Sequence, residues 1–76
     1  MNLDYYKTFY YVALSKNFTK AAELLGNNQP NVTRSMNNLE AELGCRLFAR
    51  SNRGVSLTPI GEQLFQYVSA AMNNLE

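Results

Sequence analysis

Residues 18–43, with the sequence FTKAAELLGNNQPNVTRSMNNLEAEL, decide the fold, because they contain two helix-length segments on either side of a short polar break. The first segment stops at Gly26, and glycine suits the left-handed conformation that ends many helices. We expect this segment to begin with Thr19 as its N-cap, whose hydroxyl can accept a hydrogen bond from a backbone N–H of the first turn. The small side chains of Ala21 and Ala22 would let a second helix approach closely.

The second segment predicts a longer helix that begins after Asn28 and ends before Gly44. Asparagine is a good N-cap, and Pro30 lies in the first turn, where a missing backbone N–H costs nothing. Apolar residues at helical spacing predict one narrow buried stripe, formed by Val32, Met36, Leu39 and Leu43. Two short helices around a turn predict a helix-turn-helix, and the second helix of such a pair fits the major groove of DNA.

The face of this second helix opposite the apolar stripe carries groups that suit the edges of bases. Arginine can donate two hydrogen bonds to guanine, Gln or Asn can pair twice with adenine, and a hydroxyl or proline ring can touch a thymine methyl. The alternative is an ordinary solvated face, which is the usual role of polar helix surfaces. The preceding helix and the arginines that follow favour DNA. We therefore predict DNA contacts from Asn28, Gln29, Pro30, Thr33, Arg34, Asn37 and Asn38.

Two β-capable runs, residues 45–51 and 55–57, flank a turn that contains Gly54 and predict a hairpin. Arg50 and Arg53 lie in this hairpin, where they suit phosphate contact or insertion into the minor groove. The alternative is a surface hairpin whose arginines are only solvated.

Thr58 and Pro59 then predict the start of a further helix that runs to the end of the chain. The expected fold class is mainly α: a winged helix-turn-helix of three helices and a short β-hairpin wing, followed by a long linker helix.

Residues 3–15 predict the first helix, with an apolar stripe on one side. Its aromatic side chains could stack on single-stranded bases, but their helical spacing favours a place in the core. We expect Tyr5, Tyr11 and Val12 to lie outside the stripe and to pack on the last helix of this chain or of a partner. The predicted stripe consists of Leu3, Tyr6, Phe9, Tyr10, Ala13 and Leu14.

The last helix carries more apolar residues than one buried stripe requires. A broad stripe is formed by Ile60, Leu64, Tyr67, Val68, Ala71 and Leu75. Phe65 and Met72 form a second line beside it, which favours contact with the same helix of a second subunit. The alternative is an ordinary core helix. The predicted dimerisation residues are Phe65, Val68, Met72 and Leu75.

The composition restricts the remaining possibilities. The net charge of +1 is low for a DNA-binding protein, yet four of the arginines lie in the middle of the chain and predict a local basic surface. With one cysteine and no histidine, the sequence offers no plausible zinc site and no acid–base or nucleophilic machinery, so we expect neither an enzyme nor a cofactor. The absence of a secretory signal and of a membrane-length apolar stretch predicts a cytoplasmic protein without a membrane partner.

In its order of motifs, the chain resembles the LysR-type transcriptional regulators of bacteria. The resemblance extends from the first residues to about residue 61, and the rest suits the linker helix of that family. It rests on residues 18–25, Gln29-Pro30, Arg34, Leu39-Glu40, Glu42-Leu43-Gly44, Leu47-Phe48, Arg50 and residues 57–61.

The resemblance implies a winged helix-turn-helix in residues 1–58, with the helix-turn-helix at about 18–37, and a dimerisation helix in residues 59–76. It further implies binding to an interrupted inverted repeat in double-stranded DNA, as a homodimer or, in the full-length protein, a tetramer. A small-molecule inducer would bind only to a larger C-terminal domain, which we expect to be absent from this chain. The alternative function is a winged-helix module for protein–protein contact, which the low net charge supports.

Position by position, the resemblance assigns groove contacts to Gln29, Pro30, Thr33 and Arg34 and the wing arginine to Arg53. Thr33 stands where serine is more usual and keeps the hydroxyl. Asn28 replaces the usual Ser or Thr cap and keeps the capping function. Asn27, Asn31 and Asn38 also depart from the family pattern, which affects the expected target sequence rather than the fold.

Overall fold

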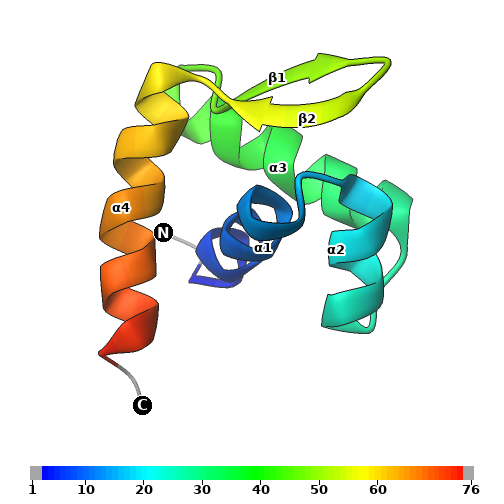
Figure 1. Ribbon diagram of the computed structural model, residues 1–76, viewed down its shortest axis with the longest axis horizontal. Coiled ribbons are helices and arrows are strands. Elements are labelled where there is room, and N and C mark those ends of the chain that lie inside the picture. The colour runs from blue at the N-terminus through cyan, green and yellow to red at the C-terminus, as the bar shows by residue number, and fades with distance from the viewer. Residues whose placement is uncertain (1–2, 75–76) are drawn as a thin grey trace.

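Helix α1 lies at the centre of the computed structural model, which describes residues 3–74, with α2 on one side of it and α4 on the other (Figure 1). Helix α3 packs against both α1 and α2, and an antiparallel hairpin lies across one end of the helices. This arrangement confirms the expected mainly helical, winged helix-turn-helix fold. The elements are α1 (Leu3–Ser15), α2 (Phe18–Leu25), α3 (Gln29–Leu43), β1 (Phe48–Ser51), β2 (Gly54–Leu57) and α4 (Pro59–Asn73).

The ends of α3 follow from local sequence, as predicted. The side chain of Asn28 accepts a hydrogen bond from the backbone N–H of Asn31 at 2.9 Å, and Gly44 ends the helix with a φ of 70°. The predicted start of α2 is wrong, since its N-cap is Asn17 rather than Thr19. Asn17 is extended and accepts from the N–H of Lys20 at 2.9 Å, which is an equally good cap and places Thr19 inside the helix.

The core contains side chains from every helix and strand of the described chain. On α3, the predicted stripe is confirmed for Val32, Met36 and Leu39, whereas Leu43, the last residue of the helix, is 43% exposed. The fully buried side chains of largest volume are Phe9, Phe48, Met36, Leu39, Leu47, Val12 and Val32.

Helix α1 is buried over a different sector than its sequence predicts. Phe9 and Ala13 are buried as expected, but Leu3 and Leu14 are 76% and 52% exposed. Val12, which we expected outside the stripe, is fully buried. The reason is that α2, α3 and α4 all pack on α1, so its buried sector is wider than the single stripe of a surface helix.

Helix α4 starts as predicted, because Thr58 caps it and Pro59 fills its first position. The Thr58 hydroxyl accepts from the N–H of Gly61 at 3.0 Å and donates to the carbonyl oxygen of Arg46 at 2.7 Å. Gly61 lies directly against the Leu47 carbonyl, where no Cβ would fit. This contact fixes how α4 is rotated about its axis.

With this rotation, α4 buries parts of both of its apolar lines. Val68 is buried, and Phe65 and Met72 are half-buried against the core of their own chain, whereas the sequence favoured contact of these two residues with a second subunit. The ring of Phe65 stacks on Tyr10 of α1 at 5.8 Å between centroids. Three members of the stripe that was expected to be buried are exposed, namely Ile60, Tyr67 and Ala71.

The end of α4 differs from the prediction as well. We expected this helix to run to the last residue, but it ends at Asn73, with Asn74 as its C-cap. The predicted dimerisation residue Leu75 lies outside the described residues. Within residues 3–74, no helix has the length and apolar character needed to cross a membrane.

Candidate nucleic-acid interface

The first turns of α3 present the predicted groove-contacting side chains on one face. Gln29, Pro30 and Arg34 are exposed and Thr33 is half-buried. Gln29 lies four residues before Thr33 and Pro30 four residues before Arg34, which places the members of each pair side by side on a helix. Among residues 3–74, no side chain or backbone group forms a hydrogen bond or ion pair with the Arg34 guanidinium. Because Arg34 is exposed, its N–H donors face solvent.

Gln29 and Thr33 are joined to each other. The side-chain amide nitrogen of Gln29 donates a hydrogen bond to the Thr33 hydroxyl oxygen at 2.6 Å. Thr33 can therefore use its own hydroxyl hydrogen to donate, while Gln29 keeps its carbonyl oxygen and one N–H for a base. This hydrogen bond fixes the positions of the Gln29 and Thr33 side chains relative to each other.

The turn that precedes α3 is closed by asparagine side chains. The Asn27 carboxamide oxygen accepts from the backbone N–H of Asn28 at 2.8 Å and from the Asn31 side chain at 3.1 Å. The predicted site residue Asn28 uses its own side-chain oxygen as the cap of α3. Asn27 and Asn31 are thus joined directly by a side-chain hydrogen bond.

Asn37 and Asn38 are exposed, but both already have partners within the chain. The Asn38 amide donates to the hydroxyl of Tyr5 in α1 at 3.2 Å. The Asn37 carboxamide oxygen accepts from the guanidinium of Arg50 in β1 at 2.8 Å. These two predicted site residues thus differ from Arg34 in having partners in other elements of the chain, although all three are exposed on α3.

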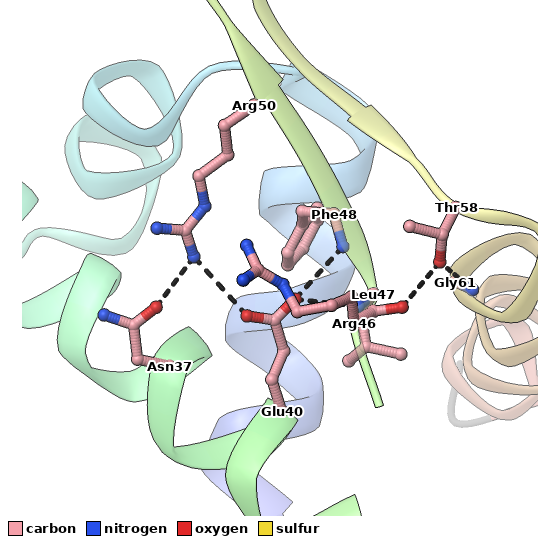
Figure 2. A network of polar contacts seen from close by, with 8 residues as sticks. All are labelled: Asn37, Glu40, Arg46, Leu47, Phe48, Arg50, Thr58 and Gly61. Atoms are coloured by element: carbon pink, nitrogen blue, oxygen red, sulfur yellow. Dashed lines mark hydrogen bonds and ion pairs between the residues drawn. The ribbon is translucent and has the colours of Figure 1, made fainter. Parts of the chain in front are cut away.

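Arg50 reaches from β1 towards Asn37 and Glu40 of α3 (Figure 2). The same terminal nitrogen that bonds Asn37 lies 3.6 Å from a carboxylate oxygen of Glu40. The guanidinium carbon also lies 4.9 Å from the ring centroid of Phe18 in α2, a cation–π distance. Its side chain is 32% exposed.

Glu40 is the residue of this region that sequence analysis missed. It is 7% exposed, and one carboxylate oxygen accepts from the backbone N–H groups of Leu47 at 2.7 Å and Phe48 at 3.2 Å. The guanidinium of Arg46 lies 3.5 Å from the same oxygen. The available signal was position, since Glu40 directly follows Leu39 and lies four residues after Met36, on the buried side of α3.

The hairpin has the predicted arrangement, although β1 is shorter than the predicted run 45–51 and β2 begins one residue before the predicted run 55–57, because Gly54 belongs to the strand rather than to the turn. Arg53 is exposed at the tip, between the paired residues Ser51 and Gly54. Further back, the N–H of Val55 donates to the carbonyl oxygen of Lys16 in the α1–α2 loop at 3.3 Å. The hairpin is thus held against the helices while its arginine tip projects into solvent.

These contacts define a surface made of the outer face of α3 and the tip of the hairpin. It offers guanidinium, amide and hydroxyl groups, and its carboxylate neighbour Glu40 is turned inward and paired. Among residues 3–74, no cluster of three or more His, Cys, Asp or Glu side chains could hold a metal ion. Such a surface is chemically suited to phosphates and base edges.

Residues 3–62 match the family described as bacterial regulatory helix-turn-helix protein, lysR family. The chain is 46% identical over 70 residues to the HTH-type transcriptional regulator YofA of Bacillus subtilis, a match that covers 92% of this chain and 25% of YofA. It is 38% identical over 76 residues to the HTH-type transcriptional regulator BenM of Acinetobacter baylyi, covering all of this chain and 25% of BenM. The chain thus spans about a quarter of the length of these relatives.

Solved structures give the same result. The crystal structure of the BenM DBD complex with catB site 1 DNA matches with a TM-score of 0.93 and 39% identity, covering 99% of this chain and 84% of that one. The CbnR DBD–DNA complex matches with a TM-score of 0.90 and 36% identity, covering 99% and 86%.

Proposed function

Because the chain belongs to the lysR family of bacterial regulatory helix-turn-helix proteins, we propose that it binds double-stranded DNA sequence-specifically as part of a transcription regulator. Helix α3 enters the major groove, and the hairpin contacts the backbone or the minor groove. Gln29, Pro30, Thr33 and Arg34 contact base edges, and Arg53 contacts phosphates or the minor groove.

The observation that carries this proposal is the outward-facing group of polar side chains on the first turns of α3, next to an exposed arginine at the hairpin tip. Gln29 of α3 and Ser51 and Gly54 of the hairpin line the same open hollow, and the fold is similar to the BenM and CbnR domains in their complexes with DNA. A module for protein–protein contact is not favoured, since it gives no reason for this set of donors. The relatives are transcriptional regulators, and we propose no catalytic role.

We also propose that the chain forms a homodimer through α1 and α4. An apolar groove runs between these helices, and the occupant we assign to it is the same surface of a second copy, as symmetric dimers require. Val68 and Met72 line this groove, as does the strongly exposed Tyr67, whereas Phe65 packs on Tyr10 of its own chain. The lining residues are Leu3, Asp4, Tyr6, Lys7, Tyr67, Val68, Ala71 and Met72.

The remaining features of the family stay predictions. The division into a DNA-binding part, residues 1–58, and a dimerisation helix, residues 59–76, is one of them. Tetramer formation and inducer binding concern the full length of such regulators, of which this chain spans about a quarter. A DNA-binding role in a bacterium would place the protein in the cytoplasm.

Selection from a library of randomised duplexes tests the proposal. We expect the chain to enrich an inverted repeat whose half-sites are separated by about one helical turn or a multiple of it. Arg34→Ala should weaken binding to the selected sequence by about 1–3 kcal/mol and relax preference at one position of each half-site. Failure of the unaltered chain to enrich any sequence would contradict sequence-specific binding.

A further inference from the structure

Arg50 differs from the other arginines of the candidate interface in how it is held. Arg53 lies exposed at the hairpin tip, and Arg34 is exposed on α3. Arg50 is exposed as well, with 32% of its side chain accessible, but it touches three residues on two helices: Asn37 at 2.8 Å, Glu40 at 3.6 Å and the ring of Phe18 at 4.9 Å. A guanidinium with these contacts would have to give up several of them to turn towards a phosphate.

Arg50 and Val55, which are paired across the hairpin, both contact other elements of the chain. Arg50 of β1 pairs with Val55 of β2. On the β2 side, the Val55 N–H donates to the carbonyl oxygen of Lys16 in the α1–α2 loop. On the β1 side, Arg50 reaches Asn37 in α3 (Figure 2). Both strands are therefore bonded to the rest of the protein at this one residue pair, close to the turn that carries Arg53.

Glu40 contacts both Arg50 and the residues at the start of β1. One of its carboxylate oxygens accepts from the N–H groups of Leu47 and Phe48, while the other faces Arg50. Residues 48 and 50 lie on the same face of β1, because side chains alternate along a strand. One side chain of α3 thus holds β1 at its start and, through Arg50, two residues further along.

We propose that Arg50 is a positioning residue, which with Asn37 and Glu40 fixes the hairpin relative to α3 and so sets where Arg53 meets DNA that α3 occupies. This inference rests on the proposed DNA binding. It removes Arg50 and Asn37 from the groups that contact DNA directly, although both were predicted to do so. The polar groups of Arg50 and Asn37 are instead used within the protein, where one guanidinium nitrogen contacts both Asn37 and Glu40 and so joins β1 to α3.

Arg50→Lys separates positioning from phosphate contact, since lysine keeps the charge but is shorter and lacks the planar group that contacts Asn37 and Glu40 through one nitrogen while it lies over the ring of Phe18. We expect affinity for the selected operator to fall about fivefold to tenfold, within the range of coupled contacts, with an unchanged slope of log affinity against log salt concentration. Arg53→Ala should cost less in the Arg50→Lys background than alone. Asn37→Ala should give a similar loss, and little more when combined with Arg50→Lys.

The free protein offers a readout that does not depend on DNA. Residual dipolar couplings should show that the hairpin changes its orientation relative to α3 in Arg50→Lys and Asn37→Ala, while the helices keep theirs. Glu42→Ala, an exposed change on the same helix, serves as the control. An unchanged hairpin orientation in both variants would overturn the inference, whether or not the chain binds DNA.

A second result would also overturn it and leave the proposed function intact. If Arg50→Lys binds like the unaltered chain while Arg50→Gln lowers the salt slope by about one, Arg50 contacts a phosphate. Failure of the unaltered chain to bind any duplex would instead contradict the proposed function. The dipolar couplings of the free protein would still show whether Arg50 fixes the orientation of the hairpin relative to α3.

Discussion

A carboxylate oxygen of Glu40 lies 2.7 Å from the backbone nitrogen of Leu47, seven residues further along the chain and just before β1. The same oxygen accepts from the N–H of Phe48. These two backbone groups are buried, and a buried donor without an acceptor is costly. Glu40 therefore holds the start of β1 against α3, whereas Gly44 ends the helix.

Replacing Glu40 by alanine should destabilise the fold by about 1–3 kcal/mol, because buried N–H groups lose their acceptor. Urea unfolding followed by circular dichroism measures the change. Glu42→Ala, on an exposed position of α3, is the matched control and should have little effect. Equal effects of the two substitutions would show that the Glu40 contacts contribute nothing to stability.

Gly61→Ala should also destabilise the protein, although alanine normally favours a helix over glycine by about 1 kcal/mol. The added methyl would meet the Leu47 carbonyl and the side chain of Leu57, and such overpacking costs about 1–3 kcal/mol. Thermal unfolding tests the sign of the effect, with Gln63→Ala at an exposed position of α4 as the control. A raised melting temperature for Gly61→Ala would contradict the close approach of α4 to the hairpin.

The hydrogen bond between Gln29 and Thr33 predicts that the two residues act together on DNA. Thr33→Val removes the hydroxyl while keeping the shape, and Thr33→Ser keeps the hydroxyl. In a double-mutant cycle on the selected operator, Gln29→Ala and Thr33→Val should be coupled by about 0.5–3 kcal/mol. Thr33→Ser should retain most of this coupling. Additive losses would show that each side chain binds independently.

The apolar groove between α1 and α4 predicts which substitutions prevent dimer formation. Tyr67 is 78% exposed and lines the groove, so Tyr67→Glu should shift the chain towards monomer in sedimentation experiments, because a charge would be buried at the interface. Gln66→Glu adds the same charge at an exposed α4 position that does not line the groove, and should leave association unchanged. A dimer that survives Tyr67→Glu would place the contact elsewhere.

Local signals predicted those parts of the fold that local chemistry controls. The Asn28 cap, the Gly44 end and the Thr58–Pro59 start are each set by a few neighbouring residues, and all were predicted correctly. The start of α2 was placed two residues late, since Asn17 and Thr19 are both capable caps and nothing local distinguishes them.

Long-range contacts controlled what sequence analysis could not predict. The direction in which α4 presents its apolar lines depends on the approach of Gly61 to Leu47. The inward turn of Arg50 depends on the hairpin folding over α3. Periodicity indicates that a face exists, but several packed neighbours decide which face is buried.

Binding of the chain to a duplex of random sequence, titrated with salt and followed by fluorescence anisotropy, tests the central claim most directly. If the surface formed by α3 and the hairpin contacts phosphates, log affinity should fall steeply and linearly with log salt concentration. Arg53→Ala should make that slope shallower by about one, whereas Arg46→Ala, an exposed arginine paired with Glu40, should not. A salt-independent affinity, or equal slopes for the unaltered chain and Arg53→Ala, would contradict a DNA-binding surface that includes the hairpin tip.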